Sequence, residues 1–163
     1  MEDTLFLGNI DALRDWGHAE DYVEMQWQIL QQKEPDDYVI ASGKAYSVRE
    51  FVLKAAANLG LEIEFKGRGV NEVGLVKSIS PPKVNELKDV TTILKPGDPV
   101  IRIDPWYFRP SEVEKLLGDP TKAFKKLNFK PRKTFDELVF EMTQSDVINS
   151  LADKQTAQLR RNV

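Results

Sequence analysis

The run Tyr38-Val39-Ile40-Ala41 limits the folds open to this chain more than any other segment. It is short, follows the turn-forming residues Pro35-Asp36-Asp37 and has a high apolar content, which is typical of a strand inside a parallel sheet. Such a strand needs neighbours, and few other segments of the sequence offer themselves as partners. We therefore expect a strand here whose sheet the rest of this sequence does not complete.

The other segments predict a mixed α/β chain of short strands and helices. Strand patterns cover residues 5–7, 61–65 and 100–104, and helical patterns cover 19–32, 47–59, 121–127 and 135–148. A short helix capped by Ser111 would hold Val113, Leu116 and Leu117. The glycines of Gly67-Arg68-Gly69 favour a hairpin or loop. Residues 80–99 are expected to form a loop or insertion and residues 150–163 a frayed tail. We expect the whole chain, residues 1–163, to form a single portion rather than two domains.

Composition excludes several classes of function. Acids and bases are interspersed, and the net charge of -3 argues against the basic face of a nucleic-acid-binding protein. The chain has no cysteine, which excludes disulfides and thiolate catalysis, and its single histidine excludes a multi-histidine metal site. No apolar run approaches the roughly 20 residues of a membrane span, and the acidic first residues are unlike a signal peptide. We expect a soluble, cytoplasmic protein that binds neither nucleic acid nor membrane.

The sequence carries no self-contained catalytic apparatus. A fold that binds a nicotinamide cofactor needs a glycine-rich turn that opens a helix, and neither G-x-G-x-x-G nor G-x-x-G-x-x-G occurs. No Tyr-x-x-x-Lys pair is present. A serine–histidine triad would depend on His18, and no serine lies in the context of a nucleophile elbow. His18 is more simply a packing or capping residue, and Lys122 a solvated helix residue.

Two constellations centred on arginines are candidates for binding an anion. In the first, Asn9 and Arg14 precede a helix that holds Val23, and an arginine before a helix start can meet a phosphate. The alternative is an exposed turn with Trp16 in the core. In the second, three aromatic residues precede Arg109, and Glu112 follows three residues later. A guanidinium can hold a pyrophosphate and a carboxylate can accept ribose hydroxyl protons, although a core aromatic strip with a local ion pair fits equally.

These segments together resemble the GDP-mannose 4,6-dehydratase family of the extended short-chain dehydrogenase/reductase superfamily. The resemblance covers about residues 5 to 148 and is carried by Leu7-Gly8-Asn9, Arg14-Asp15-Trp16-Gly17-His18-Ala19-x-Asp21-Tyr22-Val23, Glu34 to Gly43, Tyr46 to Val52, Tyr107-Phe108-Arg109-Pro110-x-Glu112-Val113-Glu114, Leu117 to Ala123 and Leu127 to Pro131. The string Arg-Asp-Trp-Gly-His is fairly specific to this family, whereas a looser Arg-Asp pattern is shared by many relatives that use UDP- and dTDP-sugars.

The resemblance implies a fold, a substrate and an incomplete enzyme. The chain would be the C-terminal part of the superfamily fold, without the N-terminal Rossmann core that binds NADP. Arg14 and Arg109 would neutralise the diphosphate of GDP-mannose and Glu112 would hold the ribose, with Asn9 and Val23 also lining the site. The family oxidises C4 of the mannose with bound NADP, eliminates water across C5 and C6, and returns hydride at C6. Its catalytic Thr/Ser, Glu, Tyr and Lys have no counterpart here, so the chain would neither bind NADP nor act alone.

Three hypotheses remain open at this point. The chain would be the substrate-binding portion of a dehydratase, completed by a cofactor-domain half or a full-length subunit within a homo-oligomer. Alternatively, it would be a non-catalytic split or degenerate paralogue that pairs with the full-length enzyme and regulates it. A third hypothesis is a fragment of an epimerase or dehydratase for UDP- or dTDP-sugars, against which Trp16-Gly17-His18 counts.

Overall fold

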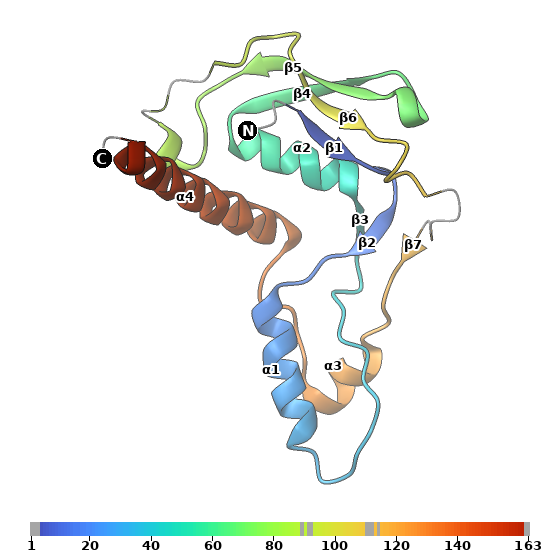
Figure 1. Ribbon diagram of the computed structural model, residues 1–163. Coiled ribbons are helices and arrows are strands. Elements are labelled where there is room, and N and C mark those ends of the chain that lie inside the picture. The colour runs from blue at the N-terminus through green and yellow to red at the C-terminus, as the bar shows by residue number, and fades with distance from the viewer. Residues whose placement is uncertain (1–3, 89, 91–92, 110–112, 114, 162–163) are drawn as a thin grey trace.

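The computed structural model describes residues 4–88, 90, 93–109, 113 and 115–161, and the side chains among these up to residue 154. Figure 1 shows an upper part, the body, which contains a four-stranded sheet, and a lower part, the arm, which contains α1, α3 and the segment 31–44. The elements are β1 (Leu5–Leu7), β2 (Leu13–Asp15), α1 (Ala19–Leu30), β3 (Ala45–Ser47), α2 (Val48–Asn58), β4 (Leu61–Lys66), η1 (Gly69–Asn71), β5 (Val73–Ile79), η2 (Asn85–Leu87), β6 (Pro99–Ile103), β7 (Lys115–Leu116), α3 (Thr121–Leu127) and α4 (Phe135–Arg161).

The sheet of the body has the strand order β1-β6-β5-β4. β1 runs parallel to β6, with Leu5 opposite Ile101 and Leu7 opposite Ile103, and the other neighbouring pairs are antiparallel. Ile101 and Ile103 are buried and Arg102 between them is exposed, because successive side chains of a strand point to opposite faces. The strands expected near residues 5–7, 61–65 and 100–104 are therefore confirmed, as is the hairpin between β4 and β5.

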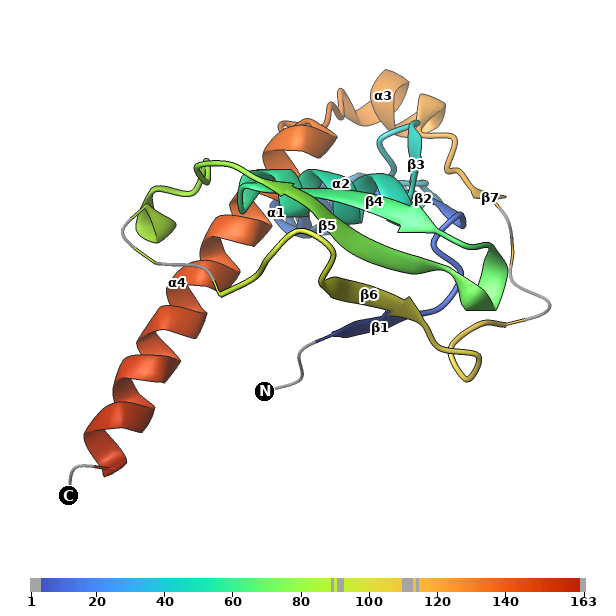
Figure 2. The same cartoon turned by 90° about the horizontal axis from the view of Figure 1, so that it is seen from above.

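Helices α2 and α4 pack on each other and α2 packs on β4, which closes the core of the body. Ser47 caps α2 in a capping box, in which its hydroxyl accepts the N–H of Glu50 while the Glu50 carboxylate accepts the N–H of Ser47. Gly60 ends the helix at φ 81°, a conformation that favours glycine. Helix α4 continues to Arg161, past the Ile148 boundary expected from the sequence, and Figure 2 shows it projecting beyond the sheet.

A second sheet of three short strands, ordered β3-β2-β7, joins the body to the arm. β2 pairs antiparallel with β3 and parallel with β7. The helix expected to begin at Ser111 and to bury Leu116 and Leu117 is wrong: Lys115–Leu116 is strand β7, and both leucines are exposed. Ser111 itself lies outside the described residues. So short a helical pattern is marginal by itself, and pairing with β2 overrides it.

The segment Tyr38–Ala41 is not a strand, so the strand expected there from its apolar pattern is wrong. No strand among the described residues pairs with it. Tyr38 and Ile40 instead pack on the buried cluster that Met25 of α1 forms with Ala123 and Phe129. The apolar pattern therefore correctly indicated that part of this segment is buried. The side chains of Tyr38 and Ile40 pack between α1 and α3, however, and not within a sheet. Residues 80–88, 90 and 93–98 hold one short helix, η2, and their interpretation as an insertion stays a prediction, as does fraying of residues 150–163.

Candidate anion-binding site at the carboxyl ends of β1 and β6

Two of the candidate residues, Asn9 and Arg109, lie in the loops that follow β1 and β6. Because these two strands are parallel, the loops that follow them, residues 8–12 and 104–109, leave the same edge of the sheet. The N–H of Asp104 donates to the carbonyl of Leu7 at 2.8 Å, so the loop 104–109 is joined at its first residue to the last residue of β1. The carboxyl edge of parallel strands is where α/β sheets commonly bind ligands. Arg109 and Asn9 both lie on loops of this edge.

A tight turn over residues 104–108 sets the position of the aromatic residues. The Asp104 carboxylate accepts the N–H of Trp106 at 2.8 Å, and its carbonyl accepts the N–H of Tyr107 at 3.0 Å and of Phe108 at 3.1 Å. Gly8 lies directly against this turn, because a Cβ there would come within 2.3 Å of the Tyr107 carbonyl oxygen. Only a residue without a side chain fits at position 8 without moving the turn.

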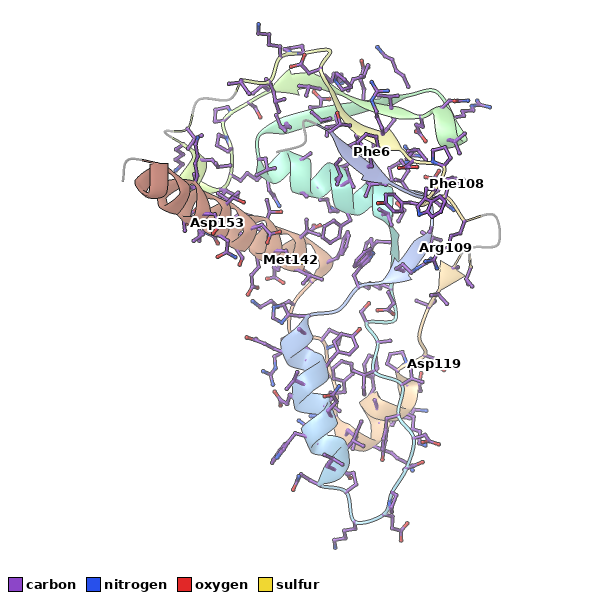
Figure 3. The ribbon with its side chains drawn as sticks, in the orientation of Figure 1. Phe6, Phe108, Arg109, Asp119, Met142 and Asp153 are labelled. Atoms are coloured by element: carbon purple, nitrogen blue, oxygen red, sulfur yellow. The ribbon has the colours of Figure 1, made fainter. Side chains whose placement is uncertain are left out.

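Arg14 lies on β2 and reaches towards the segment that follows Arg109. Its Nη1 donates to the carbonyl of Leu13 at 2.8 Å and to the carbonyl of Val113 at 2.9 Å. The second bond spans the two arginine constellations of the sequence and ties one to the other. The structure thus brings the half-buried Arg14 to the segment that Arg109 opens, and Figure 3 shows Phe108 and Arg109 on the stretch of chain between β6 and β7.

The other candidates differ in where they lie. Arg109 is exposed. Asn9 is half-buried, and its side-chain oxygen accepts the N–H of Asp11 at 3.0 Å. Val23 lies on α1 in the arm and is exposed. Glu112 lies outside the described residues.

Asp15, next to Arg14, has a structural role. Its two carboxylate oxygens accept the N–H groups of Ser42 at 2.8 Å and of Gly43 at 2.9 Å, so β2 holds the segment 31–44 of the arm. Trp16 is half-buried, and its indole N–H donates to the Tyr46 carbonyl at 3.3 Å.

Sequence reasoning missed Arg49, an arginine that binds the loop of residues 8–12 through Asp11. Arg49, on α2, holds Asp11 at 2.7 Å and Glu72 at 2.6 Å, and its guanidinium lies 4.6 Å from the centre of the Phe65 ring. Hydrogen bonds to the two carboxylates, that of Glu72 first, raise the pKa of Arg49, and the Arg49 hydrogen bond lowers the pKa of Asp11. Its location within a helix pattern carried no sign of these distant partners.

His18 and Lys122, the two lesser candidates of the sequence, both have structural roles. His18 caps α1, since its Nδ1 accepts the N–H of Glu20 at 3.2 Å, which confirms the capping role. Lys122 is not merely solvated: it pairs with Asp36 at 2.5 Å and lies 5.1 Å from the centre of the Tyr38 ring. Hydrogen bonds from Lys122 and then Lys126 hold the pKa of Asp36 far below its usual range. This cluster joins α3 to the segment 31–44.

Among the residues that the structure describes, no three histidine or carboxylate side chains come together in an arrangement that could hold a metal ion. None of the described helices combines the length and apolar character needed for a bilayer span.

Comparison with solved structures first defines the fold. The structure of RMD from Pseudomonas aeruginosa complexed with NADPH matches with a TM-score of 0.56 at 18% identity, over 90% of this chain and 36% of that one. UDP-glucose 4-epimerase from Thermotoga maritima, with UDP-glucose, matches with a TM-score of 0.55 at 16% identity, over 91% and 36% of the two chains. The chain therefore has the fold of the C-terminal part of extended short-chain dehydrogenase/reductases.

Comparison of sequences then gives the family. The model of the family "GDP-mannose 4,6 dehydratase" matches residues 1–142. The GDP-mannose 4,6-dehydratase of Yersinia enterocolitica is 49% identical over 99% of this chain and 41% of its own length. The one from Vibrio cholerae is 52% identical over 90% and 38%, and the human enzyme 48% identical over 86% and 33%. The chain belongs to the GDP-mannose 4,6-dehydratase family and spans about 33 to 41% of the length of these relatives.

Proposed function

We propose that this chain is the sugar-nucleotide-binding portion of a GDP-mannose 4,6-dehydratase. One observation carries the proposal: the bond from Arg14 on β2 to the Val113 carbonyl joins the first arginine constellation to the segment that follows Arg109. Two guanidinium groups on joined segments suit the two negative charges of a diphosphate. Arg14 and Arg109 would neutralise the diphosphate, Glu112 would hold the ribose, and Asn9 and Val23 would complete the site.

The cofactor-binding and catalytic residues of the dehydratase reaction would be supplied by a cofactor-domain half or by a full-length subunit. The sequence of this chain has neither a glycine-rich cofactor turn nor a Tyr-x-x-x-Lys pair. We therefore propose that the chain alone neither binds NADP nor converts GDP-mannose to the 4-keto-6-deoxy sugar. In the complete assembly, a cytoplasmic homo-oligomeric lyase on the route to GDP-fucose, NADP would supply oxidation and reduction at the sugar. The residues of this chain would bind and orient the nucleotide.

Calorimetric titration tests the binding function. GDP-mannose is titrated into the purified chain, whose fold is checked by circular dichroism, and UDP-glucose serves as the control ligand. Arg109→Ala should weaken GDP-mannose binding by about 30-fold, equivalent to about 2 kcal/mol for a charge-assisted contact. Arg68→Ala removes an exposed arginine of the β4–β5 hairpin and should leave the affinity unchanged. A folded chain that ignores GDP-mannose would overturn the proposal.

A second candidate function, pairing with a full-length dehydratase subunit, is favoured by the surface of the arm. Val23, Trp27 and Leu30 are spaced to share one face of α1, and they are 64%, 63% and 79% exposed. An exposed apolar stripe of this kind marks an interaction surface. Val39, in the segment 31–44, is exposed as well.

Analytical ultracentrifugation with the purified Yersinia enterocolitica enzyme tests the pairing. A complex that Trp27→Ser abolishes, and that Met142→Ser on α4 leaves intact, would support it, since Met142 is also an exposed apolar residue. If the chain and the enzyme sediment independently, the pairing function is refuted, while nucleotide binding is judged separately by calorimetry.

A further inference from the structure

Trp106 is exposed in a way that the packing of the chain does not explain. Its side chain is 86% exposed, against 63% for Trp27 on α1, and the neighbouring Tyr107 is exposed as well. Large aromatic side chains gain free energy when they are covered, so a tryptophan left in solvent beside a candidate site indicates that a ligand or partner covers it.

The backbone beneath Trp106 is fixed. Its N–H donates to the Asp104 carboxylate at 2.8 Å, within the turn whose first N–H is held by the Leu7 carbonyl. Gly8 closes the other side of the turn, with no space for a Cβ below the Tyr107 carbonyl. The backbone that carries the ring is therefore pre-organised, which lowers part of the entropic cost of binding a second flat ring.

Trp106 is also close to the charges proposed to hold the diphosphate. Trp106 and Arg109 are three positions apart in the sequence, so their Cα atoms lie at most about 11 Å apart even in a fully extended chain. The indole carries no charge and cannot replace an arginine at a phosphate. A nucleotide, however, presents a flat base one ribose away from its phosphates, and every base has a π-face on which an aromatic side chain can stack.

We propose that Trp106 stacks on the purine base of the nucleotide whose diphosphate Arg14 and Arg109 hold. The inference rests on the proposed function and adds a base-binding residue to it. Arginines recognise the diphosphate of any nucleotide sugar, whereas a large indole platform favours the larger purine over a pyrimidine. Trp106 would thus contribute to the preference for GDP- over UDP-sugars.

The test separates stacking from the binding of phosphate. GDP and inorganic pyrophosphate are each titrated into the wild-type chain, Trp106→Ala, Trp106→Phe and Trp27→Ala. Trp106→Ala should weaken GDP binding by about five- to a hundredfold and leave pyrophosphate affinity unchanged, because pyrophosphate has no base. Trp106→Phe should restore part of the GDP affinity. Trp27→Ala removes an exposed tryptophan of the arm and should leave the affinities for GDP and pyrophosphate unchanged.

The same variants give an independent optical readout. The chain has three tryptophans, so GDP should quench part of the emission of the wild type and of Trp27→Ala, and this quench should be absent in Trp106→Phe. Wild-type GDP affinity in Trp106→Ala would overturn the inference alone and would mean that another polypeptide covers Trp106. Equal loss of GDP and pyrophosphate affinity would also overturn it, as a general disturbance of the site. A folded wild-type chain that binds neither GDP nor GDP-mannose would overturn the proposed function and the inference with it.

Discussion

Replacement of Arg49 by methionine should destabilise the body and loosen the loop that carries Asn9. Arg49 donates to both oxygens of Asp11, at 2.7 and 2.9 Å, and to both oxygens of Glu72, at 2.6 and 3.0 Å. It therefore connects α2 to the loop after β1 and to Glu72, the residue between η1 and β5. Methionine keeps much of the apolar stem over Phe65 but removes every one of these donors.

The magnitude follows from how exposed each partner is. The Glu72 side chain is 11% exposed, so loss of its charge-assisted bonds and the desolvation of an unpaired carboxylate should cost about 1.5 to 3 kcal/mol. The Asp11 side chain is 67% exposed, and its pair contributes less than about 1 kcal/mol. Together these give about 2 to 4 kcal/mol, a large share of the roughly 5 to 15 kcal/mol of a typical domain.

Urea denaturation followed by circular dichroism measures this loss. With a slope of about 2 kcal/mol/M, the midpoint should fall by about 1 to 2 M at an unchanged slope. Lys77→Met is the control, because it breaks an ion pair with Glu62 in which both side chains are more than half exposed, and we expect a much smaller shift. Adding Glu72→Gln to Arg49→Met should recover part of the loss. If Arg49→Met shifts the midpoint no more than Lys77→Met, the network carries no stability and the reasoning is refuted.

Three further perturbations have defined outcomes. Ser47→Ala removes the hydroxyl that caps α2 and should lower the free energy of unfolding by about 1 kcal/mol, measured by the same urea titration. Gly8→Ala should displace the turn under Tyr107 and weaken GDP-mannose binding in calorimetry, and an unchanged affinity would show that this turn does not shape the site. Asp36 has a depressed pKa when folded, so its contribution is present above the unfolded value of about 3.9 and is lost as pH falls below it. Asp36→Asn should therefore be less stable than wild type at pH 7, with a difference in urea midpoint that shrinks as pH falls below about 4.

Features with local causes could be predicted from the sequence. The capping box depends on two residues three positions apart, Ser47 and Glu50, and Gly60 marks the end of the same helix by its freedom to take a positive φ. The strands β1 and β6 are predicted by their own apolar patterns, and both are confirmed. Each of these signals lies within a few residues of the element it specifies, so no knowledge of the tertiary fold is needed to recognise it.

Features with distant causes could not be predicted. Strand β7 exists because Lys115 and Leu116 pair with β2, which lies about a hundred residues earlier in the chain. The apolar run Tyr38–Ala41 predicts burial, but its pattern alone does not distinguish pairing in a sheet from packing between two helices. The Arg49 network likewise joins three separate segments. In the candidate site, the sequence supplied two arginine constellations as candidates, while the bond that joins them became apparent only in the fold.

The adjacent residues Arg14 and Asp15 look in sequence like one charged pair, but strand geometry separates them. Successive side chains of a strand point to opposite faces, so the two residues of β2 act in different directions. Arg14 holds the carbonyl of Val113 in the segment after Arg109, while Asp15 holds the N–H groups of Ser42 and Gly43 in the arm. A single short strand thus fixes both the candidate site and the arm that carries the exposed stripe of α1. Because both attachments depend on β2, a displacement of this strand would disturb the Arg14–Val113 bond and the anchoring of the segment 31–44 together.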